Sequence, residues 1–214
     1  MENYKIIKLN FLRNKKEVLV KFDNDTTLEL PLDLVISFSL NKGSVCSQEK
    51  YDKILKELSI FNVQKVAYRK ATSSLKTRFE LKRILLQKGY PEDEIDIAIN
   101  KLVSLNIIDD EKFAKTAIEY YSSKKMYGLN RIKRYLKQKG VPQDIVNKVI
   151  SEESTEEVQD ALITNYYERN IEKIRRKPVQ LRVSYCFRML YNAGFSGDAI
   201  SRFLNIYKPE ILGL

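Results

Sequence analysis

Apolar residues beyond position 76 recur at three- and four-residue intervals, which places them on one face of a helix. Three such stripes end at a glycine, namely Gly89, Gly140 and Gly194. The stripes consist of Leu81, Ile84 and Leu85, then Ile132, Tyr135 and Leu136, then Cys186, Met189 and Leu190. Glycine adopts the left-handed conformation that ends a helix at little steric cost. Each stripe therefore predicts a helix that stops at its glycine.

A second apolar stripe follows each glycine at equal offset. Its members are Ile95, Ala98 and Ile99, then Val146, Val149 and Ile150, then Ile200, Phe203 and Leu204. Pro91 and Pro142 precede two of these stripes, as is common near the first turn of a helix. A further helix is predicted after the acidic residues 109–111, with a stripe of Phe113, Ala114, Ala117 and Tyr121. The repeated pattern predicts a three-helix unit.

The first part of the chain has a different period. Apolar and mostly polar residues alternate over residues 7–11, 18–22 and 28–30, which is typical of short strands. We expect a small antiparallel sheet, a short helix over 32–40 and a longer helix from Ser47 toward Arg69. Thr77 and Glu80 have the spacing of a capping box at the start of the next helix.

These elements predict a mainly α-helical fold. We expect three tandem three-helix repeats in an elongated curved array, preceded by a small antiparallel β region with a helix. The β-rich region is placed at residues 1–45, a connecting helix at 46–76, and the repeats at 77–125, 126–176 and 177–214. Arrays of this kind build binding surfaces more often than catalytic pockets.

Each repeat also carries an arginine and an amide away from its apolar stripe. Arg83, Arg134 and Arg188 stand six residues before the glycines, and Gln87, Gln138 and Asn192 stand two before. At this spacing the two side chains share one exposed face of the helix. A solvated surface explains any single copy, and common descent explains a repeated pattern without present use. Recurrence in three units favours a binding face.

Charge is concentrated in the same region. The chain has 38 basic and 28 acidic residues, a net charge of +10, and residues 111–150 hold 10 basic against 3 acidic. The cations cluster at Lys124, Lys125, Arg131, Lys133, Arg134, Lys137 and Lys139, and again at Arg175, Arg176 and Lys177. Such clusters neutralise phosphates. The tyrosines between them are expected mostly at helix interfaces, with stacking on exposed bases as the alternative.

The residue types that catalysis most often uses are scarce. The sequence has no histidine, no Gly-rich phosphate loop and no nucleophile elbow. The carboxylate pairs Asp109/Asp110 and Glu152/Glu153 fit helix starts better than metal or acid/base sites. We expect no enzyme activity and no cofactor.

Other features indicate a cytoplasmic protein. No apolar run approaches a membrane span, and the first residues lack the basic and then apolar order of a signal peptide. Cys46 and Cys186 have no metal-site spacing and are expected to be reduced thiols.

Several segments resemble the RecX regulatory proteins. They are Thr-Arg-Phe-Glu-Leu at 77–81, Lys-Gly-Tyr-Pro at 88–91, Leu-Asn-Ile-Ile-Asp-Asp-Glu-Lys-Phe-Ala at 105–114, and Tyr-Gly-Leu-Asn-Arg-Ile followed by Lys-Gly-Val within 127–141. The resemblance extends from about Arg69 to the C-terminus, and departs from the pattern where Lys-Gly becomes Ala193-Gly194. It implies a protein, monomeric when free, that binds RecA filaments on single-stranded DNA. It also implies that the protein modulates, and mostly inhibits, RecA recombination, ATPase and coprotease activities in DNA repair and the SOS response.

On this resemblance we expect the RecA filament as the main partner, single-stranded DNA as a secondary one, and no membrane. The candidate contact residues are Arg83, Gln87, Lys88, Lys124, Lys125, Arg131, Lys133, Arg134, Lys137, Gln138, Lys139, Arg175, Arg176, Lys177 and Arg188. Two alternatives remain open. One is a sequence-specific helix-turn-helix transcription regulator, and the other is a nonspecific nucleic-acid-binding protein.

Overall fold

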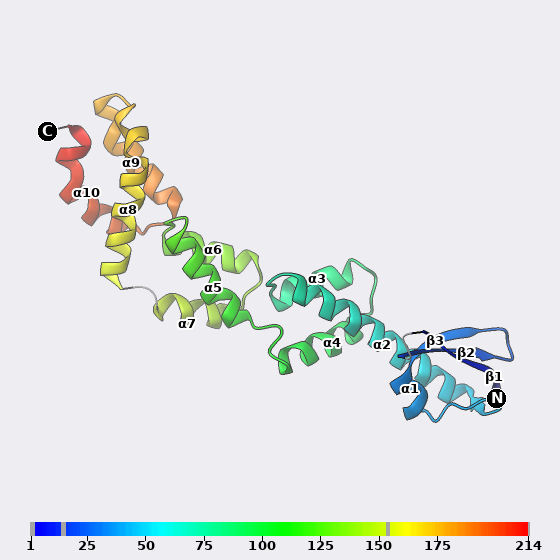
Figure 1. The fold of residues 1–214 in the computed structure, drawn as a ribbon. Coiled ribbons are helices and arrows are strands. Elements are labelled where there is room, and N and C mark those ends of the chain that lie inside the picture. Colours follow the sequence, from blue (N-terminus) through cyan, green and yellow to red (C-terminus); the bar gives the residue numbers. More distant parts are fainter. Residues whose placement is uncertain (1–2, 14–15, 153–154, 214) are drawn as a thin grey trace. The chain divides into compact units, whose positions relative to one another are not determined.

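The structure is a computed structural model that describes residues 3–13, 16–152 and 155–213. Within these residues a small antiparallel sheet lies near the N-terminus and helices make up the rest (Figure 1). The predicted class, mainly α with a small antiparallel β region, is confirmed. The chain divides into two compact units. Unit 1 contains the residues up to Ser73 together with Ile84–Ser104, and unit 2 contains Ser74–Arg83 and Leu105–Leu214.

The sheet has the strand order β3-β2-β1-β4. Its strands are β1 (Asn3–Phe11), β2 (Glu17–Phe22), β3 (Thr27–Pro31) and β4 (Val45–Ser47). The apolar alternation identifies β1 but not its buried face. Ile6 is fully buried, whereas Ile7 and Phe11 are 40% and 63% exposed. The pairing register with β2 shifts between Ile6 and Lys8, and such a shift moves the following side chains to the other face of a strand.

Two helices of unit 1 pack around the sheet. The short α1 (Leu32–Ser37) precedes β4, and α2 (Gln48–Ser73) follows it. The first turns of α2 close the sheet core, where the Tyr51 ring stacks on Tyr4 at 4.3 Å between centroids. Farther along, α2 buries Val63 and Ala67 and packs on α4 (Glu92–Ser104). The predicted connecting helix is therefore a structural part of two hydrophobic cores.

The remaining helices follow the predicted stripes, except the helix over residues 156–175, for which no stripe was predicted. They are α3 (Arg78–Leu86), α5 (Asp110–Ser123), α6 (Leu129–Gln138), α7 (Gln143–Glu152), α8 (Glu156–Arg175), α9 (Val179–Ala193) and α10 (Gly197–Leu212). Leu81, Leu85, Ile132, Leu136, Cys186 and Leu190 are all buried. The backbone at Gly89, Gly140 and Gly194 is left-handed, with φ of 81°, 71° and 97°. The glycine-terminated helices are confirmed.

The hydrophobic cores of unit 2 group the helices differently from the predicted repeats. One core joins α5, α6 and α7 around Phe113, Ile132 and Val146. Another joins α8, α9 and α10 around Tyr167 and Cys186. Each domain thus begins one helix before the frames 126–176 and 177–214. The glycine motif lies between the second and third helices of a domain, and the first helix ends without such a glycine. The motif therefore does not reveal where a domain begins. In the described part of the chain, no helix combines the length and hydropathy needed to span a bilayer.

Candidate binding face on helices α6 and α9

Helices α6 and α9 meet end to end through main-chain atoms. The N–H groups of Gly128 and Asn130 donate to the carbonyls of Ala193 and Gly194, each at 3.0 Å. No side chain caps the start of α6, so these carbonyls satisfy donors that the first turn of a helix leaves free. They also bring the negative end of one helix dipole to the positive end of another. We call this contact the α6–α9 joint.

At both glycines of the joint, Gly128 and Gly194, there is no room for a side chain. A Cβ atom on Gly128 would overlap the main chain of Gly194, and a Cβ atom on Gly194 would overlap the main chain of Arg131. The glycine that ends α9 therefore has a second role that its turn geometry does not reveal. It allows the main chain of α6 to come close to the end of α9.

A related contact connects the first turn of α3 with the end of α6. The Thr77 hydroxyl donates to the Lys139 carbonyl at 2.6 Å, and a Cβ atom on Gly140 would overlap the Phe79 ring. Thr77 also accepts from the Glu80 N–H at 3.1 Å, which confirms the predicted capping box. The Lys139 ammonium lies 2.6 Å from a Glu80 carboxylate oxygen. Lys139, a predicted contact residue, is thus neutralised within the fold.

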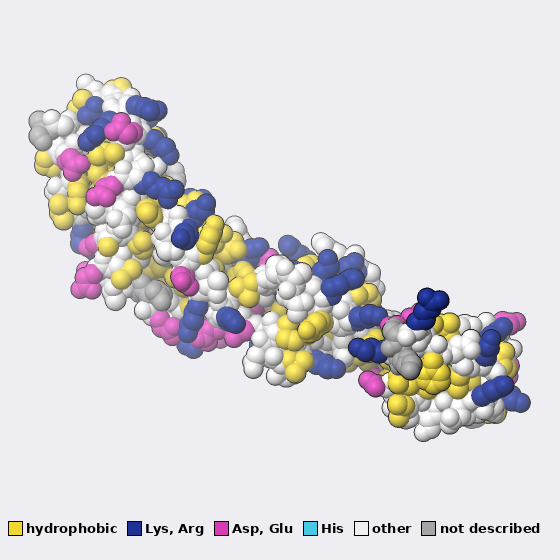
Figure 2. Space-filling view, viewed as in Figure 1, with side chains coloured by type: hydrophobic (Ala, Val, Ile, Leu, Met, Phe, Trp, Pro, Cys, Tyr) yellow, Lys and Arg dark blue, Asp and Glu magenta, His cyan; other side chains and the backbone are white. Residues whose placement is uncertain are grey.

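Five cations remain together on the surface around the joint. They are Arg131, Lys133, Arg134 and Lys137 on α6 and Arg188 on α9; Lys133 is half-buried and the others are exposed. With the two shallow hollows between these helices, they form what we call the α6–α9 face. Figure 2 shows Lys and Arg side chains gathered along one margin of the region that contains α6 and α9.

The two hollows contain cations and no carboxylates. A hollow of about 400 Å³ is lined by Arg131, Tyr166, Tyr185, Arg188, Met189 and Asn192. A second hollow, of about 340 Å³, is lined by Asn130, Lys133, Arg134, Lys137, Tyr191 and Phe195. Positive charge without a nearby acid favours an anionic ligand.

One cation of the face is fixed by the fold. The Arg131 guanidinium lies 3.9 Å from the centroid of the Tyr127 ring, a cation–π contact. Its Nη1 also donates to the Asn192 carbonyl at 3.3 Å. These contacts hold the charge of Arg131 at the edge of the larger hollow.

The other predicted cations are distributed over the surface. Arg175, Arg176 and Lys177 are exposed at the end of α8, where Arg175 pairs with Glu172 at 3.1 Å. Only Lys177 approaches the α6–α9 face, through the ring of Tyr185 at 4.9 Å. Lys124 and Lys125 are exposed at the end of α5, outside both hollows. The other predicted residues outside the hollows, all exposed, are Arg83, Gln87, Lys88 and Gln138.

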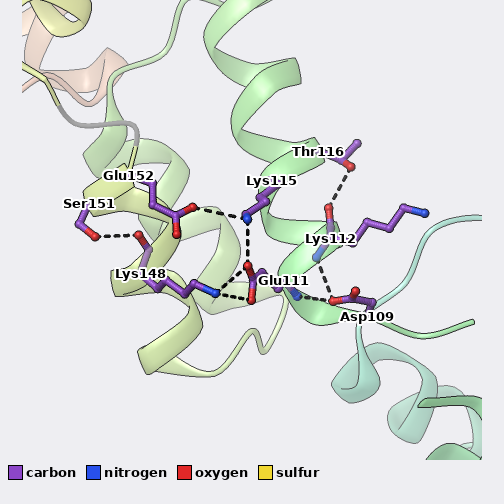
Figure 3. Close-up of polar contacts among 8 residues, drawn as sticks. All are labelled: Asp109, Glu111, Lys112, Lys115, Thr116, Lys148, Ser151 and Glu152. Carbon is purple, nitrogen blue, oxygen red and sulfur yellow. Dashed lines mark hydrogen bonds and ion pairs between the residues drawn. The ribbon is translucent and has the colours of Figure 1, made fainter. Parts of the chain in front are cut away.

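Lysines on α5 and α7 are neutralised by an ion network (Figure 3). The Glu111 carboxylate accepts from Lys115 and Lys148, each at 2.9 Å, and Lys115 reaches Glu152 at 3.5 Å. Hydrogen bonds from Lys148 and Lys115 lower the pKa of Glu111. Because these lysines are paired, the basic excess of residues 111–150 remains mainly on α6.

The carboxylate pairs considered in the sequence have structural roles where they are described. Asp109 caps α5 by accepting from the N–H groups of Glu111 and Lys112. Asp110 is buried and accepts from the Arg78 N–H at 2.9 Å, and burial raises the pKa of its carboxyl. Glu152 belongs to the ion network, and Glu153 lies outside the described residues. No group of potential metal ligands occurs among the residues described.

Two family models match the helical part of the chain. The model described as RecX, first three-helix domain, matches residues 66–102, and the model described as RecX, second three-helix domain, matches residues 109–150. A regulatory protein RecX of Clostridium perfringens strain 13 is 30% identical over 187 residues, which cover 87% of each chain. The chain is a member of the RecX family. Both RecX domain matches begin with a helix that precedes the glycine motif, as the packing of α5–α7 does.

Other RecX proteins are similar over much of the chain. A regulatory protein RecX of Clostridium botulinum strain Eklund 17B is 28% identical over 88% of each chain. A crystal structure of regulatory protein RecX has a TM-score of 0.80 at 19% identity and covers 94% of this chain and 99% of its own. RecX from Lactobacillus salivarius has a TM-score of 0.62 at 23% identity, covering 69% of this chain and 95% of its own. At these identities the two structures show a shared fold.

Sequence reasoning missed one exposed aromatic residue on α9, outside the two hollows. Phe187 is 40% exposed on α9, beside Arg188. It stands seven residues before the glycine of its helix, where α3 and α6 have Lys82 and Lys133. An aromatic residue at a position that is basic in the other repeats was the available signal.

Proposed function

We propose that this RecX-family protein regulates RecA by binding the RecA filament on single-stranded DNA. In this proposal it restrains recombination, ATP hydrolysis and coprotease activity. Its relatives are named regulatory proteins, and the resemblance of its motifs to RecX supplies the partner. The filament presents both protein surface and phosphate to an arriving protein.

The observation that carries the proposal is the α6–α9 face. Five cations from two domains surround hollows that have no carboxylate. Phosphates close to a protein surface would complement them. Binding can inhibit only if the protein prefers an inactive filament geometry or blocked ends over the active state, since a ligand shifts an equilibrium by its difference in affinity.

The helix-turn-helix alternative fits the charges less well. In that mode the second helix of a pair enters the major groove, close to phosphates. Here the corresponding α4 begins with Glu92 and Asp93, and α7 begins next to Asp144. On α7, Lys148 is paired with Glu111. These helices present acidic first turns to a polyanion, which opposes binding.

Reversal of charge on the face tests the proposal. We expect the variant Arg134→Glu/Lys137→Glu/Arg188→Glu to need at least roughly tenfold more protein than the wild type for half-inhibition of RecA strand exchange, because repulsion replaces attraction. Co-sedimentation with RecA filaments should weaken in parallel.

A matched control carries the same change in net charge elsewhere. Lys42, Lys56 and Lys208 are exposed and lie outside α6 and α9. We expect Lys42→Glu/Lys56→Glu/Lys208→Glu to inhibit nearly as well as the wild type. Equal losses in both variants would show that total charge, not this face, determines binding. Full inhibition by the face variant would overturn the proposal.

A further inference from the structure

Helix α9 exposes two parallel aromatic rings. Phe187 and Tyr191 are 40% and 61% exposed, and their rings lie 8° from parallel with centroids 6.3 Å apart. Neighbouring exposed aromatic side chains on a helix surface are a feature of binding sites. Because the other large aromatics of this domain line its core, these two rings need a separate explanation.

The repeat register places the rings beside cations. Counted back from the glycine that ends each helix, Phe187 and Tyr191 of α9 correspond to Lys133 and Lys137 of α6. The two helices meet at the α6–α9 joint. Tyr191 lines the smaller hollow together with both of these lysines and Arg134. Equivalent positions on adjoining helices thus offer a ring on one side and a cation on the other.

This combination fits a single-stranded nucleic acid. Strand-binding proteins that lack sequence preference combine a basic groove with aromatic rings on which bases stack. A duplex conceals the faces of its bases, so it could use the cations but not the rings. An acidic protein segment would likewise pair with the cations and leave two flat rings without a matching surface.

We propose that Phe187 and Tyr191 stack on bases of a single strand whose phosphates contact Arg134, Lys137 and Arg188. This inference rests on the proposed function in taking the strand of the RecA filament as the ligand. The rings supply a contact that does not depend on charge, and the cations supply a contact that depends on salt.

The test compares two strands without RecA. One is an oligothymidylate of about 20 nucleotides, and the other is an abasic strand of the same length and charge. We expect Phe187→Ala/Tyr191→Ala to bind oligothymidylate at least roughly tenfold more weakly than the wild type, with an unchanged dependence on salt. Its binding of the abasic strand should equal that of the wild type.

Matched variants separate stacking from folding and charge. Phe187→Tyr/Tyr191→Phe keeps both rings and should retain binding. Tyr68→Ala/Tyr120→Ala removes two other exposed rings, 53% and 49% exposed, and should have no effect. Arg134→Gln/Lys137→Gln should weaken the binding of both strands and reduce the dependence of that binding on salt. Thermal unfolding followed by circular dichroism confirms that each variant folds.

The remaining outcomes are decisive. If Phe187→Ala/Tyr191→Ala weakened the binding of oligothymidylate and of the abasic strand equally, the proposed stacking contact would be overturned. Unchanged strand binding with weaker co-sedimentation on RecA filaments would overturn it too, because the rings would then contact protein. If the strand results are as expected while the charge-reversed face still inhibits RecA fully, the stacking site stands and the proposed function fails.

Discussion

Gly128 and Gly89 show two different reasons for which a chain requires glycine. Gly128 has an ordinary φ of −68°, but the main chain of Gly194 occupies the place of its Cβ atom. Gly89 has a left-handed φ of 81° and no atom within 4 Å of a Cβ. The requirement is steric at the first position and conformational at the second.

Alanine at these positions should therefore have unequal costs. We expect Gly128→Ala to lower the free energy of unfolding by about 3 kcal/mol, because rigid main chain must move apart. Gly89→Ala should cost only about 1 kcal/mol, from strain at positive φ. Urea unfolding followed by circular dichroism measures both. If Gly128→Ala lowered the free energy of unfolding no more than Gly89→Ala does, the main chains at the α6–α9 joint would be able to move apart at little cost.

At this scale the sequence predicts the turn but not the close approach. The pattern before Gly140 and Gly194 is local, so their left-handed conformation can be anticipated. Their neighbours Phe79 and Arg131 come from other repeats, and only the folded chain brings them close. The same holds for Lys139, whose partner Glu80 lies 59 positions earlier.

At the scale of elements, burial periodicity predicts α3 to α7, α9 and α10 well, because each of these helices buries one stripe of apolar residues. No stripe was predicted for α8. Helix α2 is harder, since it contributes Tyr51 to the sheet core and Val63 to packing with α4. Its apolar residues therefore form no single stripe. The buried face of strand β1 is harder still to predict, because the register shift after Ile6 moves the following side chains to the other face of the strand.

The contact between α5 and α7 should depend on pH through Glu111. Its pKa is lowered in the folded protein by Lys148 and Lys115, so its ionised form stabilises the fold. That contribution is complete above the ordinary pKa of glutamate and is lost as the pH falls through the lowered value. We expect Glu111→Gln to be less stable than the wild type at pH 7, with the difference vanishing on acidification.

Urea midpoints between pH 7 and pH 3 measure this effect. Glu119→Gln, an exposed substitution on the same helix, provides the control and should show no such trend. Added salt should also reduce the difference at pH 7, since the ion network is exposed to solvent. A difference that does not shrink as the pH falls from 7 to 3 would show that Glu111 acts through packing instead of charge.

At the scale of the whole molecule, each compact unit contains one cysteine. Cys46 belongs to unit 1 and Cys186 to unit 2, and both side chains are fully buried. Burial raises the pKa of both thiols, that of Cys186 to about 12. Since the thiolate is the reactive form, labelling requires the surrounding unit to open.

Thiol labelling should therefore report on the two units separately. With Cys46→Ala and Cys186→Ala variants, each carrying a single thiol, we expect slow labelling at pH 8 and a different urea dependence for each. Adding Gly128→Ala should accelerate labelling of Cys186 and leave Cys46 unaffected, because the joint lies in unit 2. Equal acceleration of both thiols would show that the units open together.

The sequence predicted the cations of the candidate site, but not which of them are neutralised or which helices bring them together. Arg131, Lys133, Arg134, Lys137 and Arg188 were all expected, and the structure brings them to one face. Helical offsets show which cations point outward. They do not show which cations find acidic partners, as Lys139 does, or which helices adjoin.

The α6–α9 joint also bears on how such proteins evolve. It uses main-chain donors at the start of one middle helix and main-chain carbonyls at the end of the next. A domain copied by gene duplication would carry both halves of this contact. No complementary pair of side chains has to arise at the new boundary, only glycine at two positions. Selection can then diversify the outer residues, as the difference between Lys137 and Tyr191 at equivalent positions illustrates.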